Sequence, residues 1–181
     1  MFLQEGDPDA AVDAINKAFA LRPDDRVVQR LLADALLATR QFPQAMALLD
    51  RLVGDGRGVE GGELAALYHR MARASGGIGD SETQLSSLRK ALDADRRNGV
   101  VAAELADLAE AMGDDDSALK ALRAISLNCP DGPMPVAVSF YRQARIAAKN
   151  GDRQRALIFA KRALQEAPGM KEAEQLLEQV R

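Results

Sequence analysis

A turn followed by an amphipathic helical pattern recurs along this sequence, and the repetition limits the folds open to the chain. The turn residues are Gly6, Arg40, Gly79, Gly113 and Gly151, at successive intervals of 34, 39, 34 and 38 residues. Alternate turns lie 73 or 72 residues apart, which indicates duplication of a hairpin pair. A helical hairpin of this length cannot bury its apolar face alone, so the pattern predicts hairpins that stack on their neighbours.

The residue types in each copy explain why one helix ends and the next begins. Glycine ends a helix because it accepts a left-handed backbone, and the aspartate that follows accepts hydrogen bonds from the free amides of the next helix. A proline such as Pro130 then stops that helix. Small side chains five residues after the turn let two helices approach closely. These are Ala11, Ala45, Ala118 and Ala156, with Gln84 in the remaining copy.

Two glycine- and proline-rich clusters, 54–62 and 131–135, account for the intervals longer than 34 residues. Between the turns, apolar residues recur at helical spacing, as at Val28, Leu31, Leu32 and Leu36. Tryptophan is absent and aromatic residues make up only 4% of the chain, which favours helices over a β-sandwich.

We therefore expect an all-α chain with one domain over residues 1–181. The predicted helices are 8–21, 24–39, 43–54, 61–75, 80–94, 99–112, 115–126, 134–149, 153–166 and 170–181. The predicted hairpins are approximately 1–23, 24–56, 61–96, 99–130 and 134–168, followed by a capping helix at 170–181.

The order of turn, small residue, bulky residue and proline resembles the tetratricopeptide repeat family over essentially the whole chain. This resemblance implies a right-handed α-solenoid of about four or five hairpins, and the chain is similar to a segment of a longer bacterial repeat array. Helix 8–21 would be the second helix of its hairpin. We therefore expect its apolar face, with Ile15 and Phe19, to lack one neighbour.

In this family the first helix of each hairpin lines a concave groove in which partner peptides bind. The resemblance places Leu37 and a set of polar side chains on that face. The polar set is Arg30, Asp34, His69, Arg70, Arg73, Asp107, Glu110, Tyr141, Arg142, Arg145 and Lys149. Its charges form a basic, an acidic and a second basic zone along the groove, and paired arginines hold carboxylates well, so we expect a protein or peptide partner with an acidic segment.

These features favour a protein–protein interaction scaffold or adaptor, not an enzyme. The resemblance implies that it is part of a larger bacterial assembly, envelope, motility or secretion protein. One alternative is a structural module that self-associates through its open N-terminal end. Another is a module that regulates, or selects substrate for, an enzyme located elsewhere in a parent chain.

The reactive side chains form no recognisable catalytic, cofactor or metal site. His69 is the only histidine and Cys129 the only cysteine, which excludes two-histidine and CxxC metal motifs. The run 114–116 is acidic but lacks EF-hand spacing and fits a helix start. The net charge of −3 disfavours a nucleic-acid partner. The sequence shows no signal peptide and no apolar run that would insert in a membrane, so we expect a cytoplasmic location.

Overall fold

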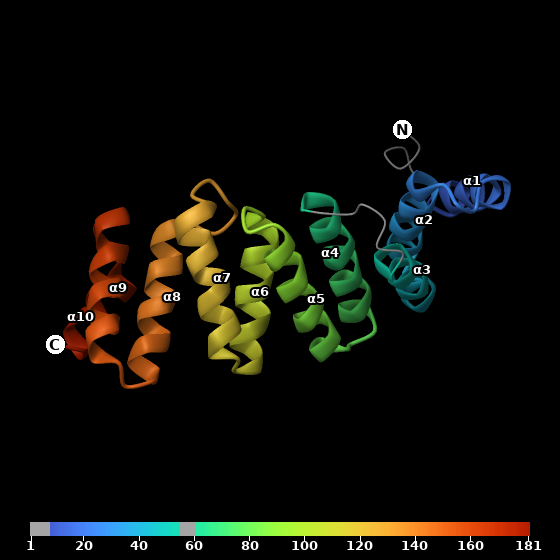
Figure 1. Ribbon diagram of the computed structural model, residues 1–181. Coiled ribbons are helices and arrows are strands. Elements are labelled where there is room, and N and C mark those ends of the chain that lie inside the picture. Colours follow the sequence, from blue (N-terminus) through green and yellow to red (C-terminus); the bar gives the residue numbers. More distant parts are fainter. Residues whose placement is uncertain (1–7, 55–60) are drawn as a thin grey trace. The chain divides into compact units, whose positions relative to one another are not determined.

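Helices follow one another along the chain in the computed structural model, which describes residues 8–54 and 61–181 (Figure 1). These residues form ten α-helices and no β-strand. The helices are α1 (Pro8–Leu21), α2 (Arg26–Ala38), α3 (Phe42–Gly54), α4 (Gly62–Gly77), α5 (Ser81–Ala94), α6 (Gly99–Met112), α7 (Asp115–Asn128), α8 (Val136–Lys149), α9 (Arg153–Glu166) and α10 (Lys171–Gln179). The predicted all-α solenoid fold class is confirmed.

The helix ends differ from the predicted bounds by a few residues, for local reasons. The second helix begins at Arg26 because the Asp25 carboxylate accepts from the amides of Val27 at 2.9 Å and Val28 at 3.3 Å. The eighth begins at Val136, directly after Pro135, which is its N-cap residue.

The turns that join the two helices of each hairpin have the predicted chemistry. Gly79, Gly113 and Gly151 have φ angles of 79°, 75° and 75°, and Arg40 has 58° in the equivalent place. The left-handed conformation costs a non-glycine residue about 1–3 kcal/mol, so the Arg40 turn is strained. The predicted turn at Gly6 and the central part of the glycine-rich cluster, residues 55–60, lie outside the described residues.

The chain divides into two compact units, residues 1–94 and 95–181, and each has an apolar core of its own. The single-domain organisation stays a prediction.

In the first unit the core lies between α2, α3 and α4. Its centre is formed by Leu36, Leu49 and Leu67, all almost fully buried. Ile15 and Phe19 of α1 are partly buried against this core. The helix face for which the sequence predicts a missing neighbour therefore has apolar contacts within its own unit.

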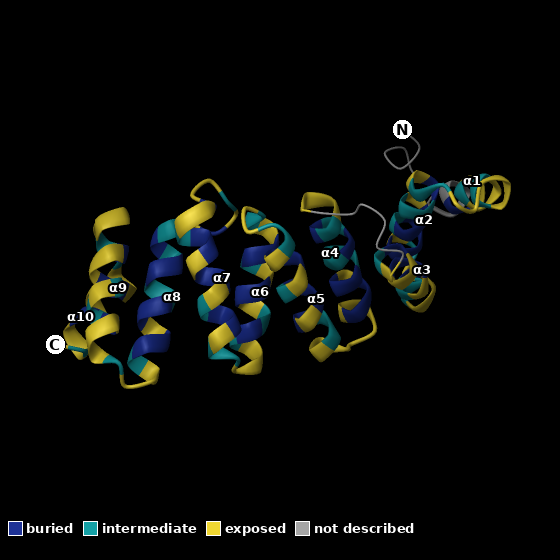
Figure 2. Ribbon diagram, in the orientation of Figure 1, coloured by how far each residue is buried: buried dark blue, intermediate teal, exposed yellow. Residues whose placement is uncertain are grey.

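In the second unit small residues allow close helix packing. Ala102, Ala106 and Ala109 of α6 and Ala118 and Ala121 of α7 have no exposed surface (Figure 2). The methyl side chain of alanine is too small to hold two helices apart, so buried alanines on both helices allow α6 and α7 to approach closely.

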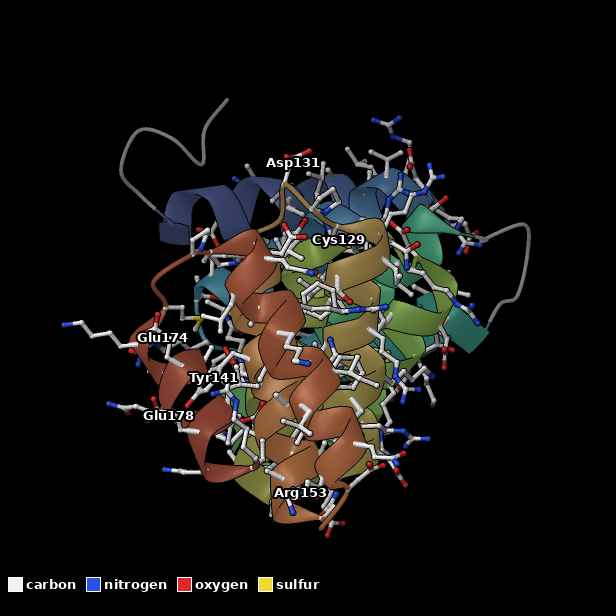
Figure 3. All side chains as sticks on the ribbon, turned by 90° about the vertical axis from the view of Figure 1, so that its left-hand side faces the viewer. Cys129, Asp131, Tyr141, Arg153, Glu174 and Glu178 are labelled. Carbon is white, nitrogen blue, oxygen red and sulfur yellow. The ribbon has the colours of Figure 1, made fainter. Side chains whose placement is uncertain are left out.

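At the end of the second unit α8, α9 and α10 share an apolar cluster. The rings of Phe140 and Phe159 stack with their centres 6.3 Å apart. Helix α10 buries Ala173 and Leu177 and exposes its glutamates, including Glu174 and Glu178 in Figure 3, as expected of a capping helix.

Two glycines at the end of α4 make room for larger side chains: Gly76 for Gln84, where the other copies have alanine, and Gly77 for Phe42. A Cβ atom on Gly76 would lie 2.9 Å from the Gln84 carboxamide, so the missing side chain on α4 makes room for the larger one on α5. A Cβ atom on Gly77 would lie 2.4 Å from the ring of Phe42. Phe42 therefore packs directly on the backbone of α4.

Candidate partner-binding site

In the first unit the predicted groove residues of α2 and α4 pair with one another. The Arg70 guanidinium donates to both Asp34 carboxylate oxygens, from Nε at 2.7 Å and Nη2 at 2.8 Å. Arg30 forms an ion pair with Glu63 nearer the start of both helices, one turn before Asp34 on α2 and two turns before Arg70 on α4. The hydrogen bond to Asp34 raises the pKa of Arg70, against the opposing effect of burial. These two pairs hold the first helices of successive hairpins side by side.

The second unit repeats the arrangement on α6 and α8. Arg142 donates to Glu110 and Asp107, at 2.6 Å each, and Arg145 also pairs with Glu110. The side chains of Arg142 and Glu110 are only 14% and 15% exposed. Burial lowers the pKa of Arg142, but the hydrogen bonds to Glu110 and Asp107 outweigh it and the pKa is raised. The paired residues also occupy equivalent repeat positions in the two units. Asp34 and Asp107 each precede the turn residue of their own hairpin by six positions, and Arg70 and Arg142 each precede theirs by nine.

Lys149, at the end of α8, pairs with a carboxylate on α7, the second helix of the preceding hairpin. The arginines described above pair instead with carboxylates on first helices. Its ammonium donates to both oxygens of Asp115 on α7, at 3.0 and 3.1 Å, and the Asn150 amide donates to the same carboxylate at 3.1 Å. These hydrogen bonds, first of all the one from Lys149, lower the pKa of Asp115.

The lowered pKa predicts a loss of stability in acid. Asp115 contributes stability above the pKa that it has in the unfolded chain, and this contribution disappears as the pH falls through the lower folded pKa. The difference in unfolding free energy between the wild type and Asp115→Asn should therefore shrink on acidification, as measured by urea unfolding at a series of pH values. In a Lys149→Met background the difference should depend less on pH. If the difference depended on pH equally steeply in the Lys149→Met background, Lys149 would not be the main cause of the lowered pKa of Asp115.

Two of the predicted residues are committed to packing in other ways. Tyr141 is partly buried against the cluster of Phe140, Phe159 and Met170, on the side of α8 that Figure 3 shows near α10. His69 is partly buried on α4. Arg73, by contrast, is exposed and has no acidic partner among the described residues.

Helix α2 exposes a different set of apolar residues from the one predicted. Leu31, assigned to the packed stripe, is 44% exposed, whereas Leu37, assigned to the open face, is only 5% exposed. The reason is that α2 packs against α1, α3 and α4 together, so its buried arc is wider than one apolar stripe and includes Leu37. Val27 is also exposed, at 54%, one turn before Leu31.

Two clefts open along the seam between α2 and α4. The first, which we call the Val27 cleft, has a volume of about 390 Å³ and is lined by Val27, Arg30, Leu31, Asp34, Glu63, Ala66 and Arg70. The second, the Arg73 cleft, has a volume of about 460 Å³ and is lined by Leu37, Ala38, Arg40, Phe42, Arg73, Gly76 and Gln84.

The clefts contain residues that sequence reasoning missed, namely Val27, Leu31 and Arg40. Two signals for them exist in the sequence. Val27 and Leu31 are four residues apart and flank Arg30 on one helix face, and an arginine stands where the other turns have glycine.

The side chains with metal-binding or nucleophilic potential do not form a site of their own. Among residues 8–54 and 61–181, no three His, Cys, Asp or Glu side chains come together in a way that would hold a metal ion. The Cys129 thiol is buried and lies 3.7 Å from the Arg96 carbonyl oxygen. Burial, with a smaller effect from Asp95, raises the pKa of Cys129, which lowers its thiolate fraction.

Among the residues that the structure describes, no helix is long and apolar enough to cross a membrane.

Comparisons with known proteins agree with these helical hairpins. The family described as tetratricopeptide repeat matches residues 2–71. The crystal structure of MamA has a TM-score of 0.65 at 20% identity, with 90% of each chain covered. That of YrrB, described as a TPR protein with an unusual peptide-binding site, has a TM-score of 0.62 at 16% identity, covering 94% of this chain and 84% of that one.

A third similar structure is that of pilF from Pseudomonas aeruginosa, with a TM-score of 0.59 at 18% identity, covering 92% of this chain and 72% of that one. A comparison with curated protein sequences finds no significant match. Identities this low show the fold alone. The chain therefore matches the tetratricopeptide repeat family over residues 2–71, and its helical-hairpin fold is similar to that of solved tetratricopeptide repeat structures.

Proposed function

We propose that this chain is a scaffold or adaptor that holds a segment of a partner protein on the first-helix face of its first unit, as part of a larger bacterial assembly. The tetratricopeptide fold is in general that of a module for protein or peptide partners, and proteins with it are generally not enzymes. The observation that carries the proposal is the pair of clefts along one seam between α2 and α4.

The Val27 cleft favours an apolar side chain of the partner. Its acidic and basic side chains neutralise one another as Arg30–Glu63 and Arg70–Asp34, so an uncharged ligand leaves no charge unpaired. Val27 and Leu31 are left exposed beside them. Covering such apolar surface stabilises a complex by about 25 cal/mol per Å² before the costs of association.

The same ion pairs prepare the cleft for binding. Each pair joins α2 to α4, and the bidentate Arg70–Asp34 contact fixes both side chains. A cleft whose walls are already ordered loses less conformational entropy when a ligand enters. This arrangement is suited to a segment that becomes ordered only on binding.

The proposal is tested by selecting peptides from a display library of random twelve-residue sequences on the full chain. Leu31→Glu should weaken the selected peptides about tenfold or more, because a carboxylate is costly in an apolar contact and a tenfold loss requires only about 1.4 kcal/mol. The matched control is Leu127→Glu on α7, where the leucine is 75% exposed and outside the seam. Selected peptides that bind both variants equally well, or a selection that enriches none, would contradict the proposal. Melting temperatures of both variants check that they remain folded.

A further inference from the structure

The Arg73 cleft differs from the Val27 cleft because its charges are not neutralised. Arg40 and Arg73 both line it, both are exposed, and neither has an acidic partner among the described residues. Arg30, Arg70, Arg142 and Arg145, the other arginines of the predicted binding set, are all paired with carboxylates.

The ends of α2 and α4 reduce this positive charge without cancelling it. A helix C-terminus is equivalent to about half a negative charge, so the two helix ends together offset roughly one of the two guanidinium charges. The remaining excess favours an anion. The Gln84 carboxamide and the ring of Phe42 line the same cleft and provide a polar and an apolar contact beside it.

The nature of the helix ends also indicates which kind of carboxylate fits. Free backbone groups at a helix C-terminus are carbonyls, which repel a carboxylate, and terminal carboxylates are usually captured by backbone amides. The donors in this cleft are side chains on exposed stems. They suit the carboxylate of an aspartate or glutamate side chain better than a chain terminus.

The distance between the clefts fixes the spacing within the partner. The residues of the Val27 cleft run along α2 from Val27 to Asp34, and those of the Arg73 cleft from Leu37, near the end of α2, to Arg40 in the turn that follows. The centres of these stretches are separated by about eight residues, or roughly 12 Å at the helical rise of 1.5 Å. An extended peptide covers that distance in about three or four residues at 3.3 Å each.

We propose that the seam between α2 and α4 binds an extended peptide with an apolar side chain in the Val27 cleft and an aspartate or glutamate three or four residues away in the Arg73 cleft. This proposal rests on the proposed function, because it names the partner segment of the same face. Charge complementarity with Arg40 and Arg73 is the argument for the acidic residue.

The test uses the peptides selected on the full wild-type chain, with binding measured by fluorescence anisotropy. The enriched sequences should place an acidic residue three or four positions from a large apolar one. The double variant Arg40→Glu/Arg73→Glu should lose about tenfold or more in affinity for them, in line with charged contacts worth about 1.5–3 kcal/mol. Replacing the acidic residue of the peptide by lysine should restore binding to the double variant.

The matched control is Lys17→Glu/Arg51→Glu, which changes the net charge equally with two exposed cations on α1 and α3 of the same unit. It should leave affinity nearly unchanged at moderate salt. If the selected peptides are sensitive to Leu31→Glu but lack the acidic residue and bind Arg40→Glu/Arg73→Glu normally, the acidic motif is wrong while the proposed function stands. If no peptide is sensitive to Leu31→Glu, both are wrong.

Discussion

Replacing Gly77 by alanine is expected to destabilise the protein by about 1–3 kcal/mol, the usual cost of overpacking. The new Cβ atom would lie 2.4 Å from the Phe42 ring, closer than carbon atoms can approach, so the ring has to leave its place on α4. This cost opposes the higher helix propensity of alanine, which alone would favour the variant by about 1 kcal/mol. Urea unfolding followed by circular dichroism measures the net effect.

Gly62→Ala is the matched control in the same helix. Gly62 is the first residue of α4, and a Cβ atom there would meet nothing within 4 Å. We expect this variant to be as stable as the wild type or slightly more so. Phe42→Ala should cost less in the Gly77→Ala background than in the wild type, because neighbouring substitutions that relieve one another are not additive. Equal stability of the two glycine variants would show that Phe42 is not packed on the backbone of α4.

Replacing Ala118 by leucine is the second substitution with a large expected effect. Ala118 has no exposed surface on α7, a helix that packs against α6, so the added carbon atoms should cost about 1–3 kcal/mol. The melting temperature should fall accordingly. Ala111→Leu on α6, where the alanine is exposed, is the control and should change stability little. An unchanged melting temperature for Ala118→Leu would mean that the position five residues after the turn does not control helix approach.

The fold could be predicted from the sequence because the signals that start and stop its helices are local. The Asp114 and Asp152 side chains accept hydrogen bonds from the amides three residues later, at 3.0 Å each. Gly113 and Gly151 have the left-handed backbone that the turn requires. None of these features depends on a distant part of the chain, so a recurring pattern was sufficient to place each helix.

The candidate site was harder to predict because it depends on neighbouring helices. The sequence places Asp107, Glu110 and Arg142 on first-helix faces, but only the register between α6 and α8 shows that they bind one another. Likewise, one apolar stripe could not tell Leu31 from Leu37, since which one is covered depends on the three helices that α2 contacts. The Val27 and Arg73 clefts are a result of those contacts.

The ion pairs between first helices also bear on how such a chain can change length in evolution. Six residues before the turn, the first helices carry in order Asp34, Arg73, Asp107 and Arg145, so acidic and basic helices alternate. Loss of the hairpin that carries Asp107 would make the basic helices of Arg73 and Arg145 successive first helices and would remove a carboxylate that now binds Arg142. Loss or gain of two hairpins would keep the order. The 72- to 73-residue spacing of alternate turns is the spacing that duplication of a hairpin pair would produce.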